Sequence, residues 1–178
     1  MRTMIRMLAV TIALAFGGVG VGALAPPQPV HAATALAAVG DVDDFVFDSL
    51  DVDYTLTRAD DGTSRMRVVE TFVAVFPETD QNRGMRRSIP DSYLGSPLFP
   101  ALVSVTDETG APRAAETDSE DGRLVITSRA DDFVHGAQTY VFTYDLENVT
   151  RAFADTDSDE LYWNVNGLEW AQRFGSVR

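Results

Sequence analysis

The clearest strand signal in the chain is the stretch Gln138-Thr139-Tyr140-Val141-Phe142-Thr143-Tyr144-Asp145-Leu146. Its large aromatic residues occupy every second position, the period that sends successive side chains to opposite faces of a β-strand. The residues between them are mostly β-branched, a type that packs well on a pleated surface. The stretch therefore predicts a long strand that places its aromatic face in the core.

Weaker signals of the same kind lie on both sides of this stretch. Short alternating or apolar runs predict further strands at residues 51–57, 65–76, 101–106, 113–117, 124–127 and 161–165. Residues 77–100 contain four Pro residues and predict a long loop. Because the chain after the N-terminal segment has no helical periodicity, we expect an all-β fold, an antiparallel β-sandwich of Ig-like architecture.

One expected strand, residues 65–76, departs from simple alternation. Met66 and Val68 share one face with Phe72, and the opposite face is almost as apolar. Glu70 interrupts the apolar face. Burial on both sides, or a bulge near Glu70, would explain the pattern.

The N-terminal residues 1–32 differ in character from the rest of the chain. Arg2 and Arg6 precede an uncharged apolar run from Met7 to Ala25, and Val30-His31-Ala32 matches a signal-peptidase site. We expect a helical signal peptide at 1–32, a flexible leader at 33–44 and the sandwich at 45–178, truncated at its C-terminus. The alternative is a retained membrane anchor, because the run of about 19 residues nearly equals a bilayer span. Either outcome exports the domain.

The composition narrows the function further. The chain has no Cys, which excludes disulfides, thiolate metal sites and Cys nucleophiles. Its net charge is −13, and the part after residue 32 carries 12 Arg against 27 acidic residues, a net charge of −15. This acidity argues against nucleic acid as a partner, because nucleic-acid binding needs cationic patches.

Against this acidic background, the stretch Asn82-Arg83-Gly84-Met85-Arg86-Arg87 concentrates positive charge within the expected loop. Guanidinium groups bind carboxylates and phosphates with two parallel hydrogen bonds. Asn82, Arg83, Arg86 and Arg87 are therefore candidate binding residues. The alternative, which the charge balance favours, is that these Arg side chains pair with carboxylates of the domain itself.

A second candidate cluster combines aromatic rings and amides, and it contains both Trp residues of the chain. Its members are Tyr162, Trp163, Asn164, Asn166 and Trp170. Flat rings stack on sugars and amides bond sugar hydroxyls, so the cluster suits a carbohydrate. A core Trp followed by an Asn-Gly turn is the simpler interpretation.

Other patterns are weaker. Asp155, Asp157 and Asp159 have the spacing that begins an EF-hand calcium-binding loop. The motif then fails, because it needs Gly where Glu160 stands and Glu where Asn166 stands. A loose calcium site and a solvated acidic turn are the two interpretations that remain. No Gly-x-Ser-x-Gly motif accompanies His135, for which we expect a surface turn. We therefore expect neither a catalytic residue nor a cofactor.

Four stretches together carry a family resemblance. They are Asp51 to Tyr54, Gln81 to Pro90, Val134 to Tyr140 and Tyr162 to Gly167. In this combination the chain resembles the predicted bacterial membrane proteins grouped as domain of unknown function 2207. The resemblance implies an exported β-rich N-terminal domain followed by transmembrane helices, which this chain lacks. It implies no activity and no catalytic residue.

These observations together predict an exported, non-catalytic β-sandwich that belongs to a membrane protein and serves recognition or scaffolding. We expect it at the extracytoplasmic side of a bacterial membrane. If the protein is truncated, we expect the domain to be secreted. The expected partner is a protein or a cell-envelope glycan. Membrane attachment would come from the missing C-terminal helices or a retained N-terminal segment. The alternatives are a carbohydrate-binding or glycan-active module and a calcium-dependent adhesion module.

Overall fold

The computed structural model describes residues 41–155, 157–167 and 170–178. The expected signal peptide, the alternative membrane anchor and most of the expected leader lie outside these residues. Among the described residues, no helix has the length and hydrophobicity needed to cross a membrane.

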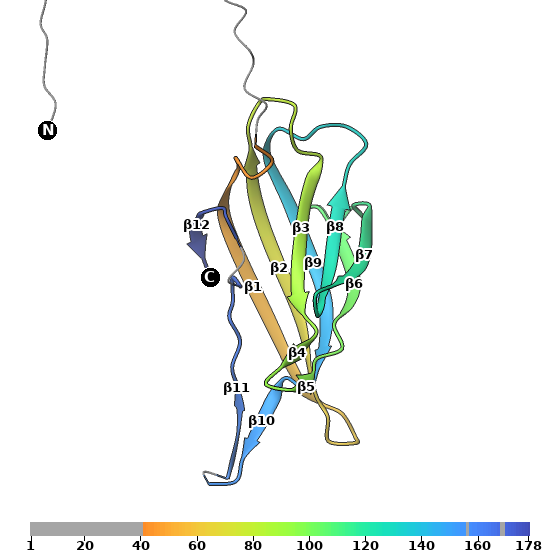
Figure 1. Ribbon diagram of the computed structural model, residues 1–178, viewed down its shortest axis with the longest axis vertical. Coiled ribbons are helices and arrows are strands. Elements are labelled where there is room, and N and C mark those ends of the chain that lie inside the picture. Colours follow the sequence, from red (N-terminus) through yellow and green to blue (C-terminus); the bar gives the residue numbers. More distant parts are fainter. Residues whose placement is uncertain (1–40, 156, 168–169) are drawn as a thin grey trace, which may run out of the picture. The chain divides into compact units, whose positions relative to one another are not determined.

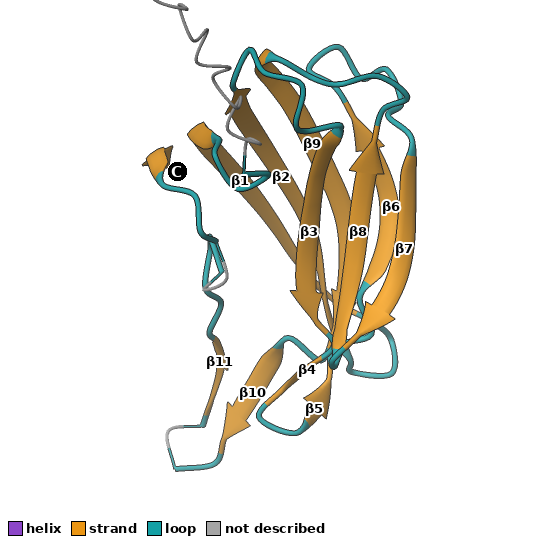
Figure 2. Ribbon diagram, turned by 45° about the horizontal axis from the view of Figure 1, so that its top comes forward, coloured by secondary structure: helices purple, strands orange, loops and turns teal. Residues whose placement is uncertain are grey.

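Two β-sheets form the body of the described part (Figures 1 and 2), which confirms the predicted β-sandwich. The larger sheet has five strands, in the order β12 (Phe174–Val177), β1 (Val46–Arg58), β2 (Ser64–Phe76), β9 (Gly136–Glu147) and β6 (Ala101–Thr106). The smaller sheet has three, in the order β3 (Gly84–Pro90), β8 (Arg123–Arg129) and β7 (Ala115–Glu120). Two small hairpins complete the fold, β4 (Ser92–Tyr93) with β5 (Ser96–Pro97) and β10 (Thr150–Phe153) with β11 (Ser158–Leu161).

The aromatic stretch that predicted the fold lies at the centre of the larger sheet. It forms β9, which pairs along its whole length with β2 and also with β6. Tyr140, Phe142 and Tyr144 are almost completely buried, as the alternation predicts. All pairs in the larger sheet are antiparallel except one, because β12 runs parallel to β1 at the edge. That parallel pair is the one departure from the expected antiparallel arrangement.

The strand β2 resolves the irregularity at Glu70. Every even-numbered residue from Met66 to Phe76 is buried, and the pairing with β9 continues without a shift across Glu70. The expected bulge near Glu70 was therefore wrong, and so was burial on both faces. Glu70 points into the core in phase with its apolar neighbours, and it is fully buried.

The segment predicted as a long loop, residues 77–100, is instead partly strand. It contains β3 and the hairpin of β4 and β5. The alternation of β3 is hard to see in the sequence, because its inward residues are Met85, Arg87 and Ile89 and the middle one is charged. Pro90 is compatible with the strand because β3 lies at a sheet edge, where a missing N–H costs no ladder bond.

Two other sequence-based boundaries change. The strand expected at 113–117 is β7, which begins at Ala115 and continues to Glu120. β7 is almost entirely exposed and therefore lacks an apolar signal. The strand expected at 161–165 was wrong, because β11 spans Ser158–Leu161 and residues 162–165 have no strand pairing.

The two sheets differ in width, and this difference shapes the molecule. The three-stranded sheet leaves β1 uncovered, and the chain that follows β11 covers β1 instead. Trp170 of that chain packs edge-to-face against Phe47 of β1, with ring centroids 4.8 Å apart, and lies tilted against Phe72 of β2 at 5.5 Å. Gln172 fixes the same chain to the start of the domain by donating to the backbone oxygen of Asp43. We call residues 162–167 and 170–172 the C-terminal segment.

Candidate functional site

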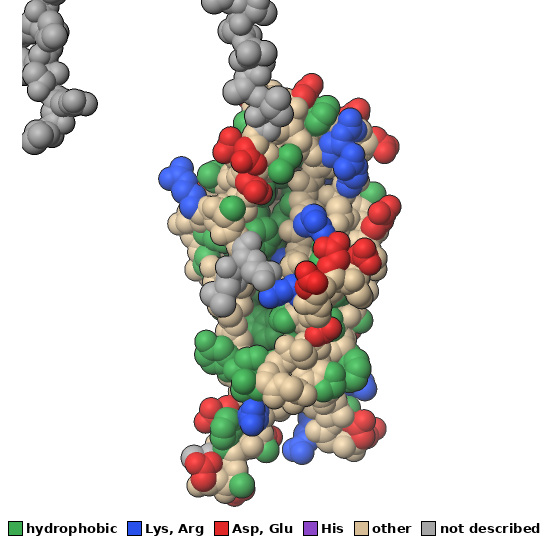
Figure 3. All heavy atoms as spheres, viewed as in Figure 1, with side chains coloured by type: hydrophobic (Ala, Val, Ile, Leu, Met, Phe, Trp, Pro, Cys, Tyr) green, Lys and Arg blue, Asp and Glu red, His purple; other side chains and the backbone are tan. Residues whose placement is uncertain are grey.

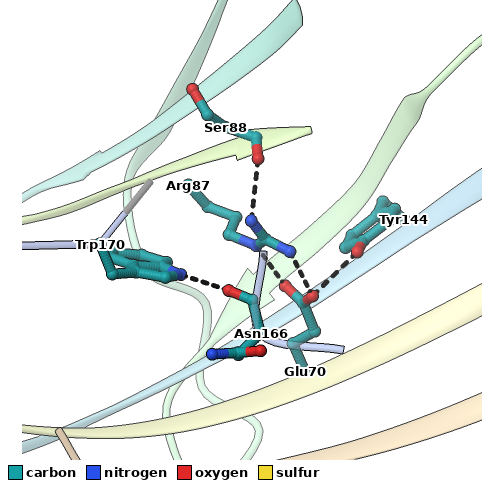
Figure 4. A network of polar contacts seen from close by, with 6 residues as sticks. All are labelled: Glu70, Arg87, Ser88, Tyr144, Asn166 and Trp170. Atoms are coloured by element: carbon teal, nitrogen blue, oxygen red, sulfur yellow. Dashed lines mark hydrogen bonds and ion pairs between the residues drawn. The ribbon is translucent and has the colours of Figure 1, made fainter. Parts of the chain in front are cut away.

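An ion pair crosses the core and joins the two sheets (Figure 4). Arg87 of β3 donates from Nε and Nη2 to the two carboxylate oxygens of Glu70 on β2, at 2.7 and 2.6 Å. Tyr144 of β9 donates its hydroxyl to Glu70 Oε1 at 2.9 Å. The remaining Nη1 of Arg87 donates to the backbone oxygen of Ser88. The Glu70 carboxylate is thus satisfied inside the protein, which buried charges require.

The pKa values of the side chains in this cluster are shifted by burial and by the opposite charges of Glu70 and Arg87. Burial by itself would lower the pKa of Arg87, but the carboxylate of Glu70 and the hydroxyl of Tyr144 raise it above its ordinary value. Burial, followed by the negative charge of Glu70, raises the pKa of Tyr144 well above its usual range. The same two causes raise the pKa of Tyr54 from 10.0 to about 12, with Arg87 opposing them. All three groups therefore keep their protons at neutral pH.

The indole ring of Trp170 lies next to this cluster. Its Nε1 donates to the backbone oxygen of Asn166 at 2.6 Å, and the guanidinium carbon of Arg87 lies 5.9 Å from the ring centroid. The backbone of Gly167 donates to the oxygen of Asn164, forming the Asn-Gly turn that the sequence predicts. Arg87 therefore contacts both the core and the C-terminal segment.

Between β3 and the C-terminal segment lies a groove of about 920 Å³. In Figure 3 it is visible as a hollow with hydrophobic side chains inside it and Arg side chains on the β3 side. Its floor includes Trp163, Trp170 and Leu98. Among its described lining residues, five Arg face two acidic residues, Asp43 and Glu120. The groove is thus apolar at its base and predominantly basic at its side.

This groove brings together the two clusters that the sequence singled out. All four residues of the Arg-rich cluster line it, and so do Tyr162, Trp163, Asn164 and Trp170. Asn166 is not among the lining residues, and it contributes through its backbone oxygen. The clusters are some 80 positions apart in the chain, so the sequence contained no sign that they meet.

The individual Arg residues have different surroundings. Arg87 forms the buried pair with Glu70, and Arg86 forms an exposed pair with Glu120 at 3.0 Å. Both therefore follow the alternative that the Arg residues pair with the domain's own carboxylates. Arg83 instead places its guanidinium 4.4 Å from the ring centroid of Phe133, and no carboxylate partner is found for it among the described residues.

The aromatic residues also differ from one another. Trp163 and Trp170 are half-buried and pack against the core, in agreement with the simpler interpretation of the sequence. Tyr162 is 68% exposed and stacks on Tyr93 of β4, with centroids 6.0 Å apart. The exposed aromatic surface among the described groove residues therefore comes from these two Tyr residues and from Phe133, which is 37% exposed. Tyr93 was not predicted, because it lies far from the Trp cluster in the sequence.

Two polar atoms of groove-lining residues have no hydrogen-bond partner within the described part of the chain. One is Oδ1 of Asn82, a residue that is 7% exposed and donates from Nδ2 to the backbone oxygen of Val42. The other is Nε1 of Trp163. Buried polar atoms usually have a partner, so these two are exceptions among the described residues.

The remaining candidates lie elsewhere. Asp155, Asp157 and Asp159 are exposed around the turn between β10 and β11. The residues that the structure describes contain no group of three or more acidic, His or Cys side chains able to hold a metal ion. His135 lies 3.0 Å from Asp80 near the surface. The Glu70 cluster escaped prediction entirely, and its only sequence signal was an acidic residue interrupting the apolar face of a strand.

Fold and groove together define a two-sheet β-sandwich with a lateral groove. The chain belongs to the DUF2207 family, because the model of the predicted membrane protein (DUF2207) N-terminal domain matches residues 48–178. The expected family resemblance is thereby confirmed. No curated protein and no solved structure matched the chain.

Proposed function

We propose that this domain is a non-catalytic recognition module of a membrane protein, that it lies on the extracytoplasmic side, and that it binds its partner in the groove between β3 and the C-terminal segment. Membership of a predicted membrane protein family supports the membrane association. The apolar run and peptidase site of the first 32 residues support the export.

One observation carries the proposal. Two clusters that lie some 80 positions apart in the sequence line a single groove, which combines an apolar floor with Arg side chains on the β3 side. Concave sites with apolar walls and a few polar groups are the usual form of binding sites. The buried carboxylate of Glu70 is already saturated by Arg87 and Tyr144, so it is poorly placed to act on a substrate.

Site-specific photo-crosslinking in cells that make the full chain tests this proposal. A benzophenone side chain is placed at Tyr162, which lines the groove, or at Thr55, which is exposed on β1 away from it. We expect a discrete adduct from position 162 and none from position 55. Adding Arg83→Ala should reduce the adduct. Equal labelling from both positions, or no adduct from position 162, would contradict the proposal.

A carbohydrate-binding module is the second candidate, and the Tyr93–Tyr162 pair favours it. Both rings line the groove, and Tyr162 has a largely exposed face on which a sugar could stack. Binding of cell-envelope glycan fragments, measured by saturation-transfer NMR, should then disappear in Tyr162→Ala. Absence of any glycan signal with the wild-type domain would remove this candidate.

A further inference from the structure

The strand β3 forms one wall of the groove and is an edge strand. It pairs with β8 on one side, and the strand order of the described sheets places no neighbour on its other side. Six of its residues, from Gly84 to Ser88 and then Pro90, line the groove. The unpaired edge therefore lies along the binding surface. An unpaired edge presents main-chain donors and acceptors to any extended chain that approaches it.

The hydrogen-bonding phase of β3 identifies which groups face the groove. Just before β3, the oxygen of Arg83 accepts from Ala130 at 2.7 Å, and just after it Asp91 donates to Gly122 at 3.0 Å. In an antiparallel pair, alternate residues bond to the same partner, so the odd-numbered residues of β3 bond to β8. The N–H and C=O groups of Arg86 and Ser88 therefore point to the free edge.

Two neighbouring contacts fit this assignment. Pro90 has the same phase as Arg86 and Ser88, so its missing N–H falls on the free edge, where Pro is tolerated. The oxygen of Ser88 accepts from the side chain of Arg87, which ends the free run of acceptors. In the middle of β3, the N–H and C=O of Arg86 and the N–H of Ser88 are free for a partner strand, and Gly84 at the start of β3 has the same phase.

The charge along this wall indicates what kind of chain would bind. Arg83 and Arg129 lie near one another at one end of β3, because Gly84 pairs with Arg129. Neither has a carboxylate partner among the described residues, although the chain as a whole carries a net charge of −13. A second copy that paired β3 on β3 would bring like-charged Arg side chains together. The charge therefore favours an acidic partner over a second copy.

The two faces of an added strand would meet different surroundings. On the inner face, Met85, Arg87 and Ile89 point toward the core and the aromatic floor. On the outer face lie Arg86 and, from β8, Arg129. A strand beside β3 would therefore place alternate side chains against apolar and basic surfaces.

We propose that the groove binds an extended polypeptide segment with alternating apolar and acidic residues, which joins the three-stranded sheet as a fourth strand beside β3. This inference rests on the proposed recognition function and specifies its ligand class. Main-chain hydrogen bonds to Arg86 and Ser88 supply affinity, and the apolar floor and Arg residues select the side chains.

Peptide binding to the folded domain tests the inference. The probe is a capped peptide of roughly six to eight residues, an ordinary strand length, with alternating Glu and Val. One control replaces Glu by Lys, and a second carries N-methyl groups on the amides of alternate residues, made in both phases. We expect the Glu peptide to bind at least about tenfold more tightly than the Lys peptide and than the N-methylated peptide whose methyl groups face β3, whereas the peptide methylated in the other phase should still bind. Equal binding of the N-methylated peptides, or no binding by any peptide, overturns the inference.

A matched pair of variants examines the same main-chain contact from the protein side. Arg86→Pro removes the free-edge N–H, whereas Arg86→Ala keeps it, and Arg67→Ala on the outer face of β2 serves as a distant control. Binding should be lost in Arg86→Pro, should weaken only partly in Arg86→Ala, which loses one cation beside the added strand but keeps the N–H, and should be unchanged in Arg67→Ala. Wild-type binding by a folded Arg86→Pro variant overturns the inference. Should Arg86→Pro fail to fold, the N-methylated peptides decide the question.

Two further measurements separate this inference from the proposed function. Hydrogen exchange at the amides of Arg86 and Ser88 should slow when the Glu peptide binds, and unchanged exchange in the bound state overturns strand addition. If the adduct from position 162 forms but is unaffected by Arg86→Pro, the recognition function stands and strand addition falls. A dimer of the free domain that Arg86→Pro abolishes would show that the edge binds a second copy, which also overturns the inference.

Discussion

Glu70 and Arg87 form a fully buried ion pair, 6% or less exposed on each side chain, that joins the two sheets of the sandwich. Each residue belongs to the inward face of its own strand, β2 or β3. The pair also lies behind the groove, since Arg87 lines it. We therefore expect the stability of the domain and the shape of the groove to depend on the same contact.

Replacing Arg87 by Met should leave the carboxylate of Glu70 buried without its cation. We expect a loss of about 3–5 kcal/mol in the free energy of unfolding, measured by urea denaturation. The double variant Glu70→Leu/Arg87→Met removes both charges and should recover most of that loss. An equal or larger loss in the double variant would show that the pair itself, and not the uncompensated charge, controls stability.

The two Tyr residues near Glu70 should respond differently to loss of their hydroxyls. Tyr144→Phe removes a hydrogen bond to a charged acceptor and should cost about 1.5–3 kcal/mol of unfolding free energy. The buried hydroxyl of Tyr54 has no partner among the described residues, so Tyr54→Phe should be neutral or stabilising. Thermal and urea denaturation of the two variants provide the comparison, and equal costs would contradict it.

Stability should fall in alkaline solution for a reason specific to these residues. The pKa of Tyr54 is raised from 10.0 to about 12, and that of Tyr144 lies well above its usual value. The folded state thus holds protons that the unfolded state releases, so this stabilisation is complete below about pH 10 and is lost as the pH rises through about 12. The urea midpoint of the variant Tyr54→Phe/Tyr144→Phe should fall less steeply between those pH values than that of the wild type. Parallel curves would contradict this cause.

At Gly84, β3 approaches β8 so closely that no side chain fits. A Cβ atom there would lie 2.0 Å from the backbone oxygen of Ser128, and φ is +145°. We expect Gly84→Ala to destabilise the domain by clearly more than about 2 kcal/mol, because the clash adds to the backbone strain. Gly110→Ala is the matched control, because φ is +85° there but no atom lies within 4 Å of the added Cβ. Its cost should stay near about 1–2 kcal/mol from backbone strain alone.

The local patterns predicted much of the larger sheet. Strands β9 and β2 were predicted almost at their observed ends, because both have an apolar inward face that period-two alternation reveals. Strands β3 and β7 were missed or misplaced. β3 has a charged residue in its inward row, and β7 is an exposed acidic edge strand. A method that identifies strands by apolar alternation fails in both situations.

The candidate binding residues could be selected from the sequence, but their positions relative to one another in space could not be predicted from it. An Arg-rich stretch in an acidic chain and a concentration of Trp and Asn were visible as anomalies of composition. The sequence did not show which Arg side chains pair with a carboxylate. Packing of the two sheets brings Glu70 to Arg87, and pairing of the strands brings Glu120 to Arg86. Tyr93 and Phe133, which contact Tyr162 and Arg83, were missed for the same reason.

The sequence by itself determined the all-β character, the aromatic core strand, the family and the residues that stand out from an acidic surface. These follow from side-chain type and local spacing, which are properties of short stretches. Tertiary structure alone decided that Glu70 meets Arg87, that β3 has a free edge, and that two distant clusters share one groove. Those relationships depend on how sheets pack and which strands end at an edge. They arise from the burial of the whole apolar surface and not from any local run of residues.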